Sequence, residues 1–181
     1  SSDVCSSDLG KVEEQLKTAV ELLDSFVTTN PKDDNVPDAL LKLGLCQQRR
    51  MSTLADPKDK QEVLASARGA YEKILKEFPK SSAFSDAVYE RAKVLARQGD
   101  IGNASNELRK FTQDPLRQAR VAPMAMINLA TLLRSQNKSA EAADLLQKTR
   151  EQFEQPLSQD PTRSSWVPLL RFHQAVALRE A

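Results

Sequence analysis

The chain has 181 residues, with 26 Lys and Arg against 25 Asp and Glu and a net charge of +1. This balance argues against a nucleic-acid-binding protein, which needs a basic stripe or a strongly basic pI, and no apolar run approaches the length of a membrane span. Glycine (5 residues) and aromatic residues (5%) are scarce whereas strong helix formers dominate, so the composition predicts an all-α protein.

Residues 1–10 are set apart from the rest of the chain. Residues 1–9, SSDVCSSDL, resemble the in-frame translation of a common short-read sequencing adapter, and they show neither a helical nor a strand period. We interpret the segment as a non-biological scar; the alternative is a disordered N-terminal tail. Cys46 is then the one biological cysteine. Because the chain also stops at Ala181 within an apolar helical pattern, we expect residues 11–181 to be truncated at both ends.

Apolar residues spaced three and four apart predict eight helices in antiparallel pairs. The first two are expected over 14–29 and 37–51, separated at Asn30-Pro31 because proline cannot continue a helix. The polar, proline-containing stretch 51–60 predicts an inserted loop. The later helices are expected over 61–78, 84–98, 102–111, 123–135 and 139–153, followed by a loop over 155–163 and a last helix from Trp166.

Small residues recur at equivalent positions of these helices, as expected where two helices cross too closely for a larger side chain. In the second helix of each pair they are Ala19, Ala67, Ala104 and Ala142, which are 48, 37 and 38 residues apart. The stretch 51–60 accounts for the longer first interval. In the first helix of each pair they are Gly44, Ala92, Ala130 and, at the end of the chain, Ala175.

Together these features resemble the tetratricopeptide repeat family. The pairs Leu43-Gly44 and Leu129-Ala130 match the family's Leu-Gly/Ala pair, and Gln98-Gly99-Asp100 matches its turn. Its closing proline is matched at Asn30-Pro31, Phe78-Pro79 and Asp114-Pro115. The resemblance covers residues 11–181 and implies a right-handed α-solenoid of antiparallel helix pairs in a single repeat array. The spacing departs from the family's usual period of about 34 residues.

Residues 70–100 are especially similar to repeats of bacterial envelope proteins. Those proteins include the lipoprotein of the outer-membrane β-barrel assembly machine and the periplasmic partner of the Tol–Pal system. This similarity favours the periplasm or cell envelope as the location, with the cytoplasm as the alternative.

No group of residues points to catalysis. His173 is the single histidine, so the chain offers no histidine pair for zinc. Cys46 lies on an apolar helical face, where a cysteine behaves as a small hydrophobic residue. The five glycines are scattered and form no phosphate-binding loop. We therefore expect no enzyme activity, no catalytic residues, no cofactor and no metal.

The resemblance implies instead a concave groove lined by the first helix of each pair, where partners dock. Counting from the small first-helix residues, the candidate partner-binding residues are Arg49, Tyr89, Lys93, Arg97, Ile127, Thr131 and Arg134. The set contains cations and no acid, and arginine binds carboxylates with two parallel hydrogen bonds. We therefore expect a protein or peptide partner that is acidic and partly apolar. The alternative is that these cations are ordinary solvated side chains.

The predicted function is a protein–protein interaction scaffold, with a role in bacterial envelope assembly. Two other functions stay open. The chain could be the accessory or regulatory repeat region of a larger enzyme whose catalytic domain lies outside this fragment. It could also be a structural repeat protein that self-associates through its terminal helices, since the sequence leaves the oligomeric state open.

Overall fold

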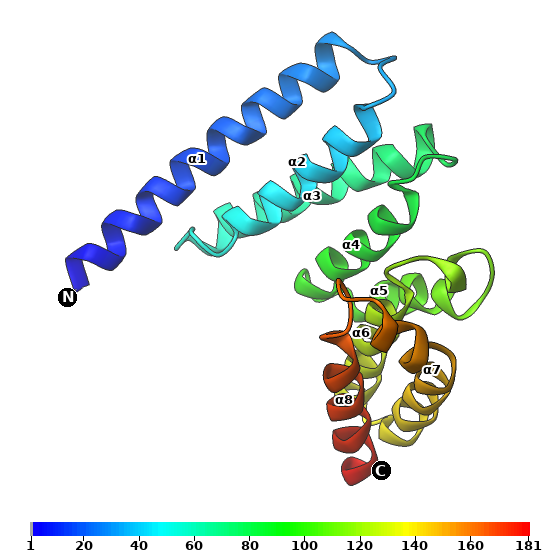
Figure 1. The fold of residues 1–181 in the computed structure, drawn as a ribbon. Helices are drawn as coiled ribbons and strands as arrows, with labels where there is room; N and C mark the ends of the chain where they lie inside the picture. The colour runs from blue at the N-terminus through cyan, green and yellow to red at the C-terminus, as the bar shows by residue number, and fades with distance from the viewer. Residues whose placement is uncertain (1) are drawn as a thin grey trace. The chain divides into compact units, whose positions relative to one another are not determined.

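The computed structural model describes the backbone of residues 2–181 and the side chains of residues 10–181. Over this range the chain is all-helical, which confirms the predicted fold class. The helices are α1 (Ser2–Thr29), α2 (Val36–Arg50), α3 (Pro57–Glu77), α4 (Phe84–Arg97), α5 (Ile101–Arg109), α6 (Ala122–Ser135), α7 (Ser139–Gln159) and α8 (Trp166–Glu180), with short 3-10 helices η1 (Lys110–Thr112) and η2 (Leu116–Gln118) after α5 (Figure 1). None of the described helices is long and apolar enough to cross a membrane.

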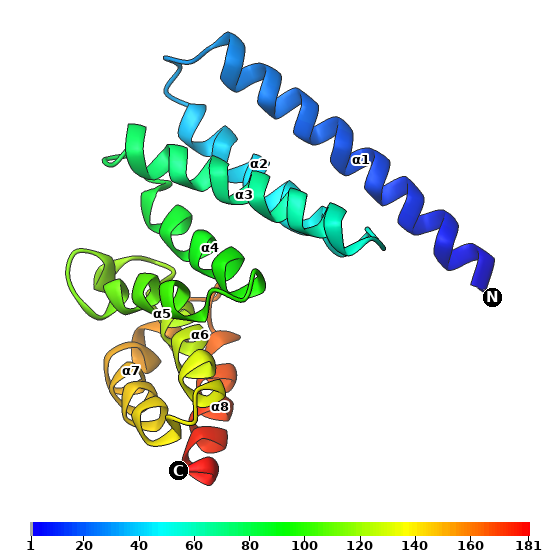
Figure 2. The ribbon, with the colours of Figure 1, turned by 180° about the vertical axis from the view of Figure 1, so that it is seen from behind.

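The chain divides into two compact units, one ending at Asp100 and one beginning at Ile101. In the first unit, α1 packs against α2, α2 against α3 and α3 against α4, and α2 also contacts α4. Figure 2 shows α1 lying alongside α2 in this unit. In the second unit, α6 packs against α5 and α7, α7 packs against α8, and α6 also contacts α8. Each unit is therefore a stack of consecutive helices, as expected for helical repeats. The single array over 11–181 stays a prediction.

The small residues lie where the helices cross. A fully buried set with 0% exposure comprises Ala67, Ala92, Ala104, Ala130 and Ala142. The tightest crossing is at Gly44, where an added Cβ would lie 2.5 Å from Cζ and 2.8 Å from Oη of Tyr71. Tyr71 is itself 0% exposed, so glycine lets the ring lie directly against the backbone of α2. Only the two outermost members of the set differ: Ala19 is half-buried and Ala175 is exposed.

Two first helices end in a turn that contains a left-handed residue. Gly99 follows α4 with φ +84°, and Asn137 follows α6 with φ +60°. Beyond each, the chain hydrogen-bonds back into the helix, from Asp100 N to Leu95 O and from Lys138 N to Leu133 O, both at 2.9 Å. These bonds give the last carbonyl groups of each helix a hydrogen-bond partner. They require a left-handed residue in the turn, and glycine and asparagine adopt that conformation most readily.

α3 begins four residues earlier than expected. The side chain of Asp56 accepts hydrogen bonds from the backbone N of Lys58 (2.6 Å) and Asp59 (3.4 Å), and Pro57 occupies the first turn. An aspartate cap followed by a proline is a favourable helix start. The stretch between α2 and α3 is therefore 51–56, shorter than the expected loop 51–60.

α7 continues through Pro156 to Gln159, where the sequence predicted a loop from residue 155. A proline inside a helix costs about 3 kcal/mol, because it removes a hydrogen bond and crowds the preceding turn. The following residue, Leu157, is 1% exposed. Burying a leucine is worth about 1.5–3 kcal/mol, so this contact offsets much of the cost and keeps the last turn helical.

α1 also begins earlier than expected, at Ser2 rather than near residue 14. It thus includes most of the segment 1–10 that the sequence sets apart. A helical backbone does not bear on whether that segment is biological, and Ser1 and the side chains of 1–9 lie outside the described residues.

Asp160 organises the connection between α7 and α8. Its carboxylate accepts hydrogen bonds from the hydroxyl (2.6 Å) and backbone N (2.8 Å) of Thr162 and from Nε of Arg163 (2.6 Å). These bonds lower the pKa of Asp160 from 3.8 to about 2, and the largest contribution comes from the Thr162 hydroxyl. Since the folded pKa lies below the unfolded one, the stabilisation is fully present above about pH 4 and is lost as the pH falls through about 2.

Asp160→Asn is expected to lower the thermal midpoint Tm at neutral pH, because the amide replaces a charged acceptor. The Tm difference from the wild type should shrink as the pH falls from about 4 towards 2. Thermal melts followed by circular dichroism across this pH range measure the difference in Tm. Asp34→Asn is the matched control, since Asp34 is an exposed aspartate in the turn between α1 and α2. A difference that stays constant down to about pH 2 would contradict the assignment.

Candidate protein-interaction surface

In the first unit, the predicted groove residues lie on α2 and α4, which are neighbours. Tyr89, Lys93 and Arg97 are spaced four apart and therefore share one face of α4. Along this face, the Lys93 ammonium lies 5.0 Å from the centroid of the Tyr89 ring, within the range of a cation–π interaction. Tyr89 is only 8% exposed, so its ring supports Lys93 more than it offers a contact to a partner.

Gln48 of α2 connects three helices through its side chain. Its Nε2 donates to the Tyr71 hydroxyl of α3 (2.7 Å) and to Oε2 of Glu90 of α4 (2.8 Å). Its Oε1 accepts from Nη1 of Arg97 at 2.9 Å. Gln48 is 6% exposed. Tyr71 is buried as well, and its burial raises the pKa of the phenol, which therefore stays protonated. The amide thus holds the arginine of α4 against α2 from inside the unit.

Glu90 was not among the residues that the sequence singled out. It is 9% exposed, and Lys93 Nζ lies 2.9 Å from both of its carboxylate oxygens. The predicted set contains no acid, but Glu90 lies next to it and neutralises the Lys93 charge inside the chain. The i,i+3 spacing of Glu90 and Lys93 on one helix is the sequence signal that could have revealed the pair.

Two candidate cations of the first unit have no carboxylate partner among residues 10–181. Arg97 is exposed and bonds the neutral amide of Gln48. Arg49 is exposed at the end of α2, and beside it a shallow pocket of about 440 Å³ is lined by Val12 and Leu16 of α1. Positive charge with adjacent apolar surface is thus present where the sequence predicts partner binding.

The candidates of the second unit lie on α6 and differ in their surroundings. Ile127 is 2% exposed, so it belongs to the core and not to an open groove. Thr131 is exposed and donates its hydroxyl to the Ile127 carbonyl at 3.0 Å. Arg134 donates from Nε and Nη2 to the two carboxylate oxygens of Glu180 on α8, both at 2.7 Å. Its charge is already neutralised by a bidentate pair.

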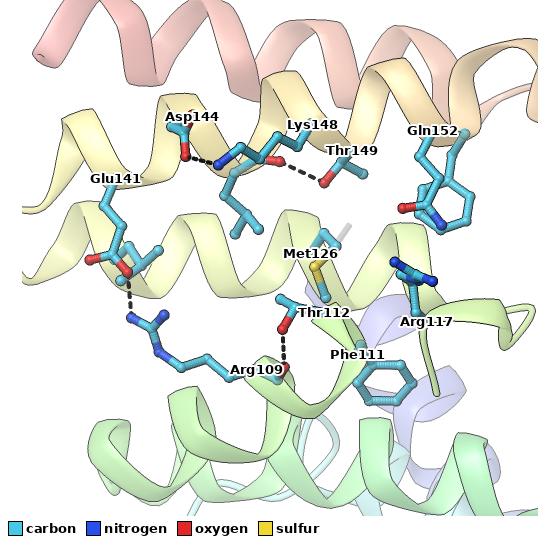
Figure 3. Close-up of a pocket in the computed structure, with 13 residues that line it drawn as sticks. Arg109, Phe111, Thr112, Arg117, Met126, Glu141, Asp144, Lys148, Thr149 and Gln152 are labelled. Atoms are coloured by element: carbon cyan, nitrogen blue, oxygen red, sulfur yellow. Dashed lines mark hydrogen bonds and ion pairs between the residues drawn. The ribbon is translucent and has the colours of Figure 1, made fainter. Parts of the chain in front are cut away.

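A pocket of about 380 Å³ lies in the second unit between η1 and α7, over α6 (Figure 3). Its floor is apolar, with Phe111 and Met126 nearly inaccessible. The charges on its rim are paired with one another or with neighbours, as Arg109–Glu141 (2.6 Å), Lys148–Asp144 (2.7 Å) and Arg117–Asp114 (2.8 Å). Because binding pockets orient ligands with a few available polar groups, this rim gives no reason to place the interaction site here.

One family comparison bears on these helices. Residues 38–81, which cover α3 and nearly all of α2, match a family model described as tetratricopeptide repeat. The match supports that family for the helix pair that contains Gly44, Tyr71 and Arg49. No curated protein matches the chain, and nothing in the comparisons supports the similarity to envelope proteins. Tetratricopeptide repeats are typically non-catalytic and mediate protein–protein interactions.

Proposed function

We propose that the chain is a protein-interaction scaffold that binds a segment of a partner protein on its first unit, at Arg49 of α2 and Arg97 of α4. One observation carries the proposal. These exposed arginines keep uncompensated charge, whereas Lys93 and Arg134, predicted by the same template, are neutralised by Glu90 and Glu180.

The partner segment that fits this face is acidic and partly apolar. A guanidinium binds a carboxylate through two parallel hydrogen bonds. Leu45, 37% exposed, lies one helical turn before Arg49 and supplies an apolar contact. The bond from Arg97 to Gln48 holds one guanidinium in place before binding, which lowers the entropy lost on association.

A random peptide library displayed on phage, selected against the immobilised chain, tests the proposal. We expect the enriched peptides to combine Asp or Glu with apolar residues. The double variant Arg49→Glu/Arg97→Glu should weaken their binding by roughly 100-fold, about tenfold for each exposed arginine, since tenfold corresponds to 1.4 kcal/mol. Fluorescence anisotropy with labelled selected peptides measures the affinity.

The matched control is Lys76→Glu/Lys80→Glu, which makes the same change in charge at exposed residues of the same unit. Binding to this control should fall much less. Enrichment of basic or purely apolar peptides would contradict the proposal, as would an equal loss of affinity in the two double variants.

The setting that we propose is bacterial envelope assembly, on the similarity of residues 70–100 to repeats of envelope proteins. Sequencing the genomic locus upstream and downstream tests this part separately. A signal sequence upstream supports it. A start codon without a signal contradicts it, and a catalytic domain in the same frame would favour the accessory region of a larger enzyme instead.

A further inference from the structure

Glu90 is a buried acid of α4 that bonds both to Lys93 and to the amide that holds Arg97. It is 9% exposed. Lys93 Nζ lies 2.9 Å from both of its carboxylate oxygens, and Nε2 of Gln48 donates to Oε2 at 2.8 Å. Because Gln48 also accepts from Nη1 of Arg97, one carboxylate acts on two of the candidate cations, on one directly and on the other through Gln48.

The amide of Gln48 has a donor end and an acceptor end, and its contact with Glu90 determines which end meets Arg97. Nε2 carries two N–H groups, and these are given to the Tyr71 hydroxyl and to Glu90. A hydroxyl can donate or accept, but an ionised carboxylate can only accept, so Glu90 requires Nε2 on its side. The acceptor Oε1 is then directed to Arg97, which can only donate.

Arg97 favours the same orientation of the amide but is less able to impose it. Its guanidinium is exposed, so water can replace Gln48 as the acceptor. Glu90 is buried and would lose a hydrogen bond that water cannot easily replace if the amide turned over, and such a loss is costly. Glu90 is therefore a positioning residue for Arg97.

Glu90 also keeps one positive charge away from a partner. Lys93 and Arg97 are four residues apart, so they lie one turn apart on the same face of α4. Without Glu90 this face would carry two adjacent available cations and would attract a run of acids. A partner cannot easily take Lys93 from Glu90, because the buried carboxylate would lose its neutralising charge.

We propose that Glu90 sets the specificity of the site, by directing the acceptor end of Gln48 to Arg97 and by withholding Lys93, so that α4 offers one oriented guanidinium to one carboxylate. The partner segment that fits α4 then has a single acid with uncharged neighbours, and further acids beside it gain nothing there. This inference rests on the proposed function and goes beyond it by distinguishing an isolated acid from a run of acids.

Two fluorescein-labelled peptides of equal length serve as probes. The first has a single glutamate between leucines in a serine background, and the second has glutamate in place of every serine. Fluorescence anisotropy at one fixed salt concentration, since salt screens exposed charges, gives the affinity of the 181-residue chain for each peptide.

The double variant Glu90→Gln/Lys93→Met tests the positioning role at constant net charge. It removes the acid together with the cation that the acid neutralises, so the available charge of α4 is unchanged. Arg97 loses its fixed acceptor, and the affinity for the single-glutamate peptide should fall roughly two- to tenfold, as expected when one side chain must be immobilised on binding. An affinity equal to that of the wild type overturns the positioning role.

The single variant Glu90→Gln tests whether Lys93 is withheld. Lys93 becomes available in this variant, so the affinity for the glutamate-rich peptide should be roughly two- to fivefold higher than in the double variant, as for one exposed ion pair. Equal affinities in the two variants overturn this part. The matched control is Glu72→Gln/Arg68→Met, which removes an ion pair of 2.7 Å from α3 without changing the net charge and should bind both peptides like the wild type.

A measurement on the wild-type chain needs neither variant nor peptide. Nitrogen-15 NMR should show slower rotation of the guanidinium of Arg97 than of Arg49, because the Nη1 group of Arg97 is bonded to an acceptor that Glu90 holds in place. Equal rotation rates overturn the proposal even if the Glu90 variants fail to fold.

The variant Arg49→Glu/Arg97→Glu, measured with the same two peptides, separates this inference from the proposed function. If that variant binds both peptides like the wild type, the proposed function is wrong and the inference is wrong with it. If it loses affinity whereas Glu90→Gln/Lys93→Met does not, the proposed function stands and only the role of Glu90 is wrong.

Discussion

Gly44→Ala is expected to destabilise the chain by about 1–3 kcal/mol, although alanine is normally the better helix former by about 1 kcal/mol. The added methyl group would lie 2.5 Å from Cζ of Tyr71, well inside van der Waals contact. The ring is fully buried and its hydroxyl accepts a hydrogen bond from Gln48. It therefore cannot move aside without breaking that bond or separating α2 from α3.

Urea unfolding followed by circular dichroism measures the effect, and Gly69→Ala is the matched control. A Cβ at Gly69 meets nothing within 4 Å, and Gly69 lies in the interior of α3. This variant should therefore gain up to about 1 kcal/mol of stability from helix propensity alone. Opposite signs for the two substitutions would show that contact with Tyr71, and not the loss of glycine itself, causes the destabilisation.

The same substitution in a chain that lacks the Tyr71 ring tests the contact between position 44 and that ring. In Tyr71→Leu the ring is absent, so adding Gly44→Ala should cost less than it does in the wild-type chain. The two substitutions share one contact and are expected to couple. Equal costs in the two backgrounds would show that the ring is not what excludes a side chain at position 44.

Gln48→Ala is expected to destabilise the first unit by about 2–3 kcal/mol, because a buried hydrogen bond to a charged group is worth about 1.5–3 kcal/mol. The substitution removes the donor to Tyr71 and Glu90 and the acceptor for Arg97. The Tyr71 hydroxyl and one oxygen of Glu90 then lose a partner in a buried environment, which is more costly than losing an exposed contact.

Gln61→Ala is the control for this variant, since Gln61 is exposed on α3, and a change within about 0.5 kcal/mol is expected there. Urea midpoints of the two variants give the comparison. Gln48→Ala should also weaken binding of acidic peptides selected on the wild type, because Arg97 loses its anchor. A stability loss below about 1 kcal/mol would show that the network adds little to the packing of α2, α3 and α4.

Much of the fold follows from local features of the sequence. The 3.6-residue period of apolar side chains and the prolines at 31 and 79 locate most helices to within a few residues. Gly99 and Asn137 mark two turns because their left-handed backbone disfavours most other residues. The recurring small residues mark the helix crossings, since only a short side chain fits there.

The ends of α3 and α7 were less predictable. Polar residues at 57–60 and a proline at 156 resemble a loop when only neighbouring residues are considered. In the folded chain, the Asp56 cap begins α3 early, and the burial of Leu157 holds the last turn of α7. Both depend on particular contacts that outweigh average propensity.

The sequence by itself therefore determined the helical class, the repeat register and the face on which partner binding is expected. It determined them because periodicity, turns and close crossings are local or repeat along the chain. Only the tertiary structure decided which cations on that face keep their charge. The bonds from Arg97 to Gln48 and from Arg134 to Glu180 join residues 49 and 46 positions apart. Such partners meet through helix packing, so charge pattern along one helix does not reveal them.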